Sequence, residues 1–191
     1  HSNGVLHLDL KPSTVLMDSS GCPRLLDFNL ASHPSRGTPR LGGTLPYMSP
    51  EQIQCFLGAA DATTLNEQSD IFSLGVMLHE MLCGEVPFDC SAHTTSSKVA
   101  AQALVERQLS AAGSSRWQRC EVSSSLRCIV ERCLAVDRRD RFVSMADLIR
   151  SLQRGKRSSA HTDDTVEKAL GNRRSREHVD RHAAGRVEQV Q

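Results

Sequence analysis

The sequence has little of what would direct a protein to a membrane or to nucleic acid. No segment approaches the roughly 18 consecutive apolar residues that cross a bilayer, and the first residues show no charged stretch followed by an apolar one, as a signal peptide would. Lysine and arginine number 23 against 22 acidic residues, for a formal net charge of +1. Because neither sign dominates, charge gives no argument for nucleic acid or a membrane as partner. We expect a soluble, cytoplasmic protein.

Cysteine pairs of the metal-binding or redox kind are also missing. The seven cysteines are odd in number and contain no Cys-x-x-Cys spacing. We therefore predict free thiols in a reducing compartment.

The 191 residues, 39% of them hydrophobic, suffice for one domain with a core and a tail.

A short hairpin is predicted near the N-terminus. Apolar runs at 15–17 and 24–26 flank Asp18-Ser19-Ser20-Gly21, a turn sequence. This hairpin would bring Asp9 and Asp27 toward one end. Residues 31–45 follow no period and predict a long irregular loop, which in a compact domain is usually functional.

Helical patterns dominate from there to about residue 153. Ser49-Pro50-Glu51-Gln52 predicts a capped helix start, and Gly58 its end. Apolar spacing predicts a buried helix over 67–83 that stops at Gly84, a weaker helix over 98–109, and a further one around 126–134. Ser144, with Asp147 three residues later, predicts the cap of a last helix.

The apolar period fades from Arg154 onward into arginine, glutamate, aspartate, histidine and serine. We predict two parts, a folded domain over 1–153 and a solvated, disordered tail over 154–191. A basic docking arm is the alternative for the tail.

Several motifs resemble those of protein kinases, in family order. Residues 7–14, HLDLKPST, resemble the catalytic loop H-R-D-L-x-x-x-N; Asp27-Phe28-Asn29 resembles D-F-G; and Ser49-Pro50-Glu51 resembles A-P-E. Residues 43–51 look like the substrate-side loop of serine/threonine kinases, particularly bacterial ones. Residues 69–76 and 137–142 are similar to the start of the family's central helix and to its late arginine motif.

The resemblance covers residues 1–153 and implies a fold and a reaction. The fold would be mostly α, a kinase-like C-terminal lobe with a small β-hairpin at the catalytic loop and with the N-terminal β lobe absent. The reaction would be transfer of the ATP γ-phosphoryl to serine or threonine of a protein substrate, with ATP and Mg²⁺ as cofactors.

The resemblance also implies roles for single residues. Asp9 would take or orient the hydroxyl proton, and Lys11, which favours serine/threonine over tyrosine specificity, would lie near the transferred phosphoryl and bind ATP. Asp27 would bind magnesium and the nucleotide. Thr14 stands at the position of the family's loop asparagine, which holds a second magnesium, and would be the other ligand to cofactor and metal. The hairpin would set base and metal ligand side by side.

Other residues would have supporting roles in such a lobe. By resemblance, His7 braces the catalytic loop, Asp70 anchors its backbone, Thr44 shapes the acceptor site, and Glu51 pairs with Arg141, a buried ion pair of the kind that costs several kcal/mol to break.

Three positions depart from the family pattern. Thr14 replaces the loop asparagine, and a hydroxyl is a weaker magnesium ligand than an amide oxygen. Asn29 replaces a glycine, although asparagine is the next most tolerant residue for unusual backbone angles. Leu8 replaces the arginine that captures a loop phosphate. We therefore predict that phosphorylation of Ser32, Ser35 or Thr38 is not required for activity.

The glycine-rich phosphate loop, the strand lysine and its glutamate partner would lie upstream of His1, and no Gly-x-Gly-x-x-Gly occurs in the chain. Three interpretations stay open. The chain is a truncated serine/threonine kinase whose 191 residues alone are inactive, a pseudokinase that serves as a protein-interaction module, or a degenerate fragment with no stable product.

Overall fold

The computed structural model describes residues 1, 3–33, 37, 40–88, 96–110, 117 and 120–158, and the side chains as far as residue 155. Two compact units are distinguished: His1–Ser151, and Leu152–Gln191, of which only residues up to 158 are described. Ser35, Thr38, Cys90 and most of the predicted tail lie outside the described residues, so the tail stays a prediction.

A two-stranded antiparallel hairpin follows the first ten residues. Strand β1 (Val15–Met17) pairs with β2 (Pro23–Leu25), with Val15 opposite Leu25. The second strand begins one residue earlier than predicted, because Pro23 pairs with Met17. Asp18 closes the turn: hydrogen bonds from Ser20, Cys22 and Arg24 lower the pKa of its carboxyl to about 2.

Helix α1 (Pro50–Leu57) confirms the predicted start and stop. The Ser49 hydroxyl accepts from the backbone nitrogen of Gln52 at 3.3 Å, and the side-chain oxygen of Gln52 accepts from the backbone nitrogen of Ser49 in return. Gly58, at φ 78°, ends the helix in the left-handed conformation that glycine adopts at least cost.

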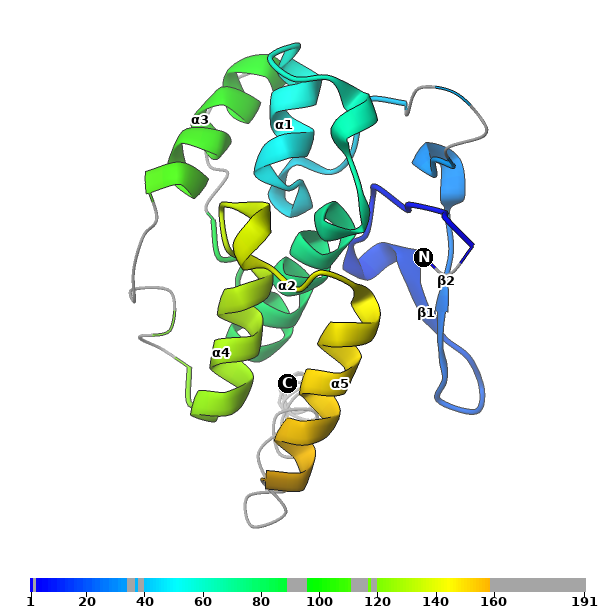
Figure 1. The fold of residues 1–191 in the computed structure, drawn as a ribbon, viewed down its shortest axis with the longest axis vertical. Helices are drawn as coiled ribbons and strands as arrows, with labels where there is room; N and C mark the ends of the chain where they lie inside the picture. The colour runs from blue at the N-terminus through cyan, green and yellow to red at the C-terminus, as the bar shows by residue number, and fades with distance from the viewer. Residues whose placement is uncertain are drawn as a thin grey trace, which may run out of the picture. The chain divides into compact units, whose positions relative to one another are not determined.

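Helix α2 (Glu67–Cys83) is the central element, and its predicted bounds are confirmed. Asn66 caps it and Gly84 ends it. Gly75 lets α4 (Ser124–Cys133) approach, because a Cβ at residue 75 would lie 2.6 Å from the Cys133 Cβ. Figure 1 shows α4 beside α2, and α1 beside α3 (Ser97–Ser110).

The remaining elements are one helix and several 3₁₀ turns. Helix α5 (Met145–Ser158) is capped by Ser144 as predicted and continues past residue 153. The 3₁₀ turns are η1 (Pro12–Thr14), η2 (Phe28–Leu30), η4 (Leu45–Tyr47), η5 (Ala62–Thr64) and η7 (Arg138–Asp140). No helix in the described part of the chain is long and apolar enough to span a membrane.

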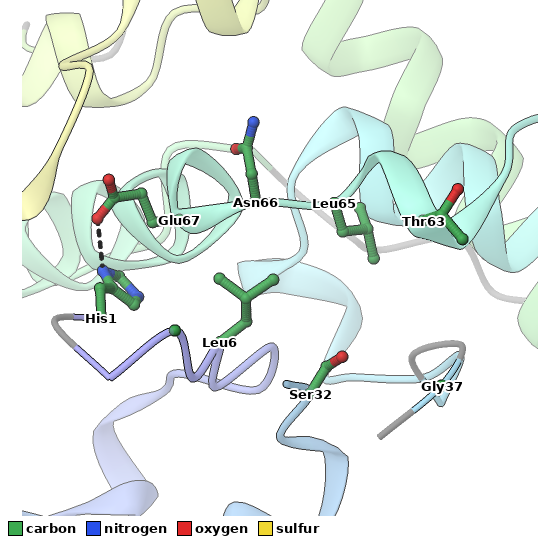
Figure 2. A pocket seen from close by; sticks show the side chains of 9 residues that line it. His1, Leu6, Ser32, Gly37, Thr63, Leu65, Asn66 and Glu67 are labelled. Carbon is green, nitrogen blue, oxygen red and sulfur yellow. Dashed lines mark ion pairs between the residues drawn. The ribbon is translucent and has the colours of Figure 1, made fainter. Parts of the chain in front are cut away.

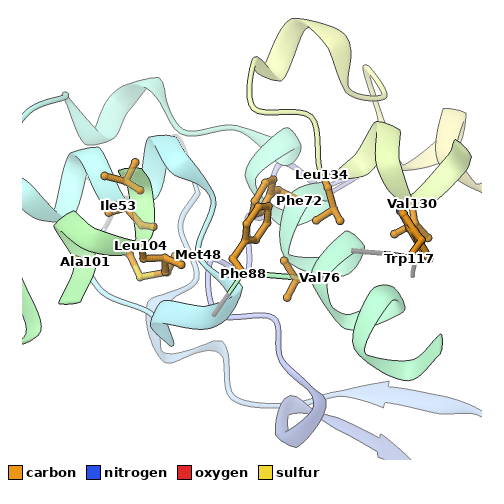
Figure 3. Packing of buried hydrophobic residues seen from close by; sticks show 11 residues of the cluster. Met48, Ile53, Phe72, Val76, Phe88, Ala101, Leu104, Trp117, Val130 and Leu134 are labelled. Atoms are coloured by element: carbon orange, nitrogen blue, oxygen red, sulfur yellow. The ribbon is translucent and has the colours of Figure 1, made fainter. Parts of the chain in front are cut away.

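The core joins the helices to the loop before α1. Phe72 of α2 stacks on Phe88 with ring centroids 5.9 Å apart, and Leu104 of α3 and Met48 lie in the same cluster, as Figure 3 shows. The mostly helical fold with a small hairpin is thus confirmed.

The cysteines correct one prediction. Cys83, at the end of α2, and Cys120 form a disulfide with their Cα atoms 5.3 Å apart. The prediction of free thiols is wrong for this pair, because tertiary packing brings together two residues 37 positions apart. The other described cysteines are free: Cys22, Cys55, Cys128 and Cys133.

Candidate active site

Helix α2 anchors the loop over residues 7–14 through Asp70. The Asp70 carboxylate is fully buried, and it accepts from the backbone nitrogens of His7 and Leu8, each at 2.8 Å. His1 Nε2 lies 2.7 Å from the same carboxylate. Because a buried carboxylate requires such partners, Asp70 fixes the backbone that carries Asp9.

Leu8 is held in an unusual conformation by its surroundings. Its φ is 61°, in the left-handed region that residues with a Cβ rarely adopt. The Leu8 carbonyl accepts from the Gln52 side chain at 2.9 Å, and the leucine side chain packs with buried Cys55 and Leu65. A leucine packed among apolar side chains therefore stands at the position where the family pattern has an arginine.

Asp9, Lys11 and Thr44 form the polar centre of the site. The Asp9 carboxylate accepts from both the backbone nitrogen and the hydroxyl of Thr44, each at 2.9 Å. Lys11 Nζ lies 3.0 Å from Asp9 Oδ2 and donates to the Thr44 hydroxyl at 2.8 Å. A carboxylate, a cation and a loop hydroxyl thus converge from residues up to 35 positions apart.

Thr14 is buried next to this centre and is bonded to the backbone of Lys11. The side chain is 1% exposed, and its hydroxyl donates to the Lys11 carbonyl at 2.9 Å while accepting from the Lys11 nitrogen at 3.2 Å. Both of these bonds therefore hold the hydroxyl within the loop over residues 7–14. These bonds disfavour the predicted ligand role of Thr14 and favour a role in shaping the loop around Lys11.

Asp27 is positioned by its neighbours on both sides. The Leu26 nitrogen donates to the Thr14 carbonyl at 2.9 Å, and His7 Nε2 lies 3.0 Å from the Leu26 carbonyl. The His7 ring also contacts Phe28, with centroids 4.9 Å apart. His7 thus braces the segment that carries Asp27.

The Asp27 carboxylate contacts the side-chain amide of Asn29, whose Nδ2 donates to Oδ1. No hydrogen bond or ion pair joins Asp27 to Asp9 or Lys11 among the described residues, so the predicted convergence of the two carboxylates stays a prediction. The left-handed φ of 61° falls on Asp27, whereas Asn29 lies in the η2 turn without a positive φ. The substitution of glycine by asparagine is therefore unstrained.

The loop before α1 is held by hydrogen bonds from two helices. Ser73 of α2 donates to the Tyr47 carbonyl at 2.8 Å, and Gln108 of α3 donates to the Met48 carbonyl at 2.9 Å. The Tyr47 hydroxyl donates to Glu80 at 2.8 Å. Burial, followed by the bond to Glu80, raises the pKa of Tyr47 to about 12. Sequence reasoning missed Glu80 and Gln108, because neither belongs to a motif and only tertiary packing brings them to this loop.

A pocket of about 480 Å³ lies apart from this centre. Figure 2 shows residues that line it, and the dashed line marks the ion pair between His1 and Glu67, 3.1 Å long. None of Asp9, Lys11, Thr14 and Asp27 lines the pocket. Among the described residues, no cluster of three or more histidine, cysteine, aspartate or glutamate side chains could hold a metal.

Comparison with known proteins identifies the family to which the chain is related. The model of the protein kinase domain matches residues 1–151. The chain is 41% identical over 93 residues to the probable serine/threonine-protein kinase PknB of Lactococcus lactis, covering 47% of this chain and 14% of that protein. Identity to the DNA damage-responsive serine/threonine-protein kinase RqkA of Deinococcus radiodurans is 42% over 93 residues, 46% of this chain and 13% of that one.

A longer alignment, 29% identical over 160 residues, relates the chain to the serine/threonine-protein kinase PknB of Mycobacterium tuberculosis and covers 81% of this chain and 23% of that protein. The chain therefore belongs to the protein kinase family. Its relatives named here are bacterial serine/threonine kinases, and it spans less than a quarter of their length.

Proposed function

We propose that residues 1–153 are the C-terminal lobe of a protein serine/threonine kinase, which transfers the γ-phosphoryl of ATP to a serine or threonine of a protein substrate. The observation that carries the proposal is the meeting of Asp9, Lys11 and Thr44 through contacts of 2.8–3.0 Å. Phosphoryl transfer depends on positioning and charge neutralisation, and this centre supplies a carboxylate and a cation beside the acceptor loop.

The geometry supports a different chemical role for each of the three residues. Asp9 accepts or orients the proton of the incoming hydroxyl, since its carboxylate lies at the acceptor loop. Lys11 brings a positive charge to the transferred phosphoryl. Thr44 contacts both side chains, and so keeps the lysine and the carboxylate in a fixed arrangement.

The cofactors of the proposal are ATP and Mg²⁺. Magnesium, when bound, neutralises charge on the phosphates. Asp27 fits a hard cation that prefers oxygen ligands, because its carboxylate is exposed and one oxygen accepts no hydrogen bond from the described residues. Thr14 enters the proposal as a residue that supports the loop near the nucleotide, because its hydroxyl is hydrogen-bonded to the Lys11 backbone.

A protein-interaction module without catalysis is the second candidate. Two observations favour it. The Thr14 hydroxyl is buried and bonded within the loop, which removes one expected ligand. The hairpin and the η2 turn that follows it also expose apolar side chains over half of their surface, and such residues are typical of surfaces that contact another protein. They are Leu16 at 56%, Met17 at 59% and Phe28 at 53%.

Thermal stability with nucleotide separates the two candidates. For the complete encoded protein, we expect ATP with Mg²⁺ to raise the unfolding temperature more than ATP alone, and Asp27→Ala to abolish the difference. Equal unfolding temperatures with and without Mg²⁺ would favour the interaction module. Sequencing the coding region before His1 is an independent check, since a glycine-rich loop and a Val-Ala-x-Lys pattern there would complete the kinase.

We also infer a cytoplasmic location, because ATP is the proposed phosphoryl donor and four of the described cysteines are free. The Cys83–Cys120 disulfide argues for an oxidising environment instead. Alkylation of cells before lysis distinguishes the two: cytoplasmic protein should carry the alkylating label on both Cys83 and Cys120.

A further inference from the structure

Position 14 does not supply the amide oxygen that a second ligand would need. The Thr14 hydroxyl donates to one backbone atom of Lys11 and accepts from another, at 2.9 and 3.2 Å. With the side chain 1% exposed, turning this hydroxyl toward a cation would break both bonds. A metal at Asp27 therefore has to find its next oxygen elsewhere.

Asn29 places a side-chain amide directly against the Asp27 carboxylate. Its Nδ2 donates to Asp27 Oδ1, and both residues are exposed. A half turn about the last side-chain bond exchanges the nitrogen and oxygen of an amide, and this rotation is soft. It would bring Asn29 Oδ1 next to the carboxylate. Two hard oxygens side by side are the donors that Mg²⁺ and Mn²⁺ prefer.

The backbone supports this pairing. Asp27 has a φ of 61°, and the η2 turn follows at once, so the side chains of two residues two positions apart face each other. The other oxygen of Asp27 accepts no hydrogen bond from the described residues and is open to the same cation. The bend in the chain thus presents a carboxylate and an amide together.

We propose that Asn29 supplies an amide oxygen ligand to the metal site anchored by Asp27, in place of the ligand that Thr14 does not provide. The inference rests on the proposed function, because that function requires a divalent cation at Asp27. It goes further by assigning the ligand to a position where the family pattern has a glycine without a side chain.

Binding of Mn²⁺ tests the proposal without any need for catalysis. Electron paramagnetic resonance of free Mn²⁺ gives the dissociation constant for the 191-residue chain, first with the metal alone and then with ATP. We expect Asn29→Ala to weaken binding at least about tenfold, since even outer-shell partners of a metal are worth that much. Asn29→Asp should bind as tightly as the unaltered chain or more tightly, because a carboxylate replaces the amide oxygen.

The matched control is Asn3→Ala, which removes another exposed asparagine and should leave Mn²⁺ affinity unchanged. Asn29→Ser serves as a second variant in case the alanine variant fails to fold. A nuclear magnetic resonance titration adds a direct readout: Mn²⁺ should broaden the side-chain amide signals of Asn29 at lower concentration than those of Asn3.

Two outcomes would overturn the proposal. The first contradicts only the role of Asn29, and the second contradicts the proposed kinase function as well. If Asn29→Ala binds Mn²⁺ as tightly as the unaltered chain or more tightly, while Asp27→Ala loses binding, the amide only competes for the carboxylate and the kinase proposal stands. If Asp27→Ala leaves the affinity unchanged, no metal site exists there, and both proposals fail.

Discussion

Arg141 and Glu51, which are 90 residues apart in the sequence, form a bidentate ion pair. Arg141 Nη1 donates to Glu51 Oε1 at 2.7 Å, and Nη2 donates to Oε2 at 2.9 Å. The arginine is fully buried, its remaining donors reach backbone carbonyls, and its guanidinium lies 4.9 Å from the Phe72 ring centroid. The pair joins the start of α1 to the segment before α5.

Removing one partner of this pair should destabilise the fold strongly. We expect Arg141→Ala to lower the free energy of unfolding by about 3–5 kcal/mol, because Glu51 would be left without its buried partner. Urea titration followed by circular dichroism measures the change. The double variant Glu51→Gln/Arg141→Met should recover part of the loss, and a loss below about 1 kcal/mol for Arg141→Ala, the value of an exposed pair, would contradict the prediction.

The same pair should make stability depend on pH. Burial opposes the charge on Glu51, but the hydrogen bond and positive charge of Arg141 outweigh it, so the pKa of Glu51 is lowered. A lowered pKa in the folded state adds stability above the ordinary glutamate pKa, and this stability is lost as pH falls through the folded value. Unfolding free energies at several acidic pH values should therefore fall less steeply for Glu51→Gln than for the unaltered chain. Parallel curves would contradict the assignment.

Thr44 should matter for catalysis through its hydroxyl. It donates to Asp9 and accepts from Lys11, so Thr44→Ala removes two bonds at once. We expect a loss of about tenfold in phosphoryl transfer rate, near the free energy of one such bond, whereas Thr44→Ser retains the hydroxyl and most of the rate. Radiolabelled ATP and the complete encoded protein provide the assay. Equal losses for alanine and serine would assign Thr44 a packing role only.

Activity should not require phosphorylation of the loop before α1. Leu8 packs against Cys55 and Leu65, and none of the described residues in this cluster is a cation that could receive a phosphate. Joint substitution of Ser32, Ser35 and Thr38 by alanine should leave the rate of the complete protein unchanged. Collapse of activity in this triple variant would refute the prediction. Leu8→Arg should instead lower thermal stability, because it places a charge in an apolar site.

The disulfide should contribute measurably to stability. Closing a loop between residues 37 positions apart is worth about 3–4 kcal/mol in the chain-entropy account. Cys83→Ser/Cys120→Ser should lower the unfolding temperature, and a reducing agent should lower that of the unaltered chain by a similar amount. The double serine variant should not respond to reductant. Cys22→Ser/Cys128→Ser, which alters two exposed free thiols, is the matched control and should change little.

Local signals predicted the helix ends because short-range contacts determine them. Ser49, Gly58 and Gly84 act within one turn of their own helix, and each does what its sequence context predicted. The buried face of α2 was predicted only in part. The apolar spacing that predicted this helix includes Ile71, which is fully buried, and Met81, which is 58% exposed. Phe72 lies outside that spacing and is fully buried. A helix that is packed on most sides has no single apolar face, so the spacing of its apolar residues does not predict which of them are buried.

The candidate site likewise has a part that the sequence predicted and a part that only the structure shows. Motif order indicated that Asp9, Lys11 and Thr44 belong together, and the structure brings them into contact. The direction of the Thr14 hydroxyl and the contact of Asn29 with Asp27 depend on side-chain geometry, which no spacing rule contains. The pairing of Cys83 with Cys120 is likewise a product of tertiary packing.

Trp117, the single tryptophan of the chain, is 5% exposed. Its ring lies 4.8 Å from that of His79 on α2, and the Arg127 guanidinium of α4 lies 5.6 Å from its centroid. Intrinsic fluorescence excited at the red edge therefore originates from one known place between two helices. Loosening of α2 against α4 should shift this emission toward longer wavelength, so the protein carries its own optical reporter of helical packing and needs no attached dye.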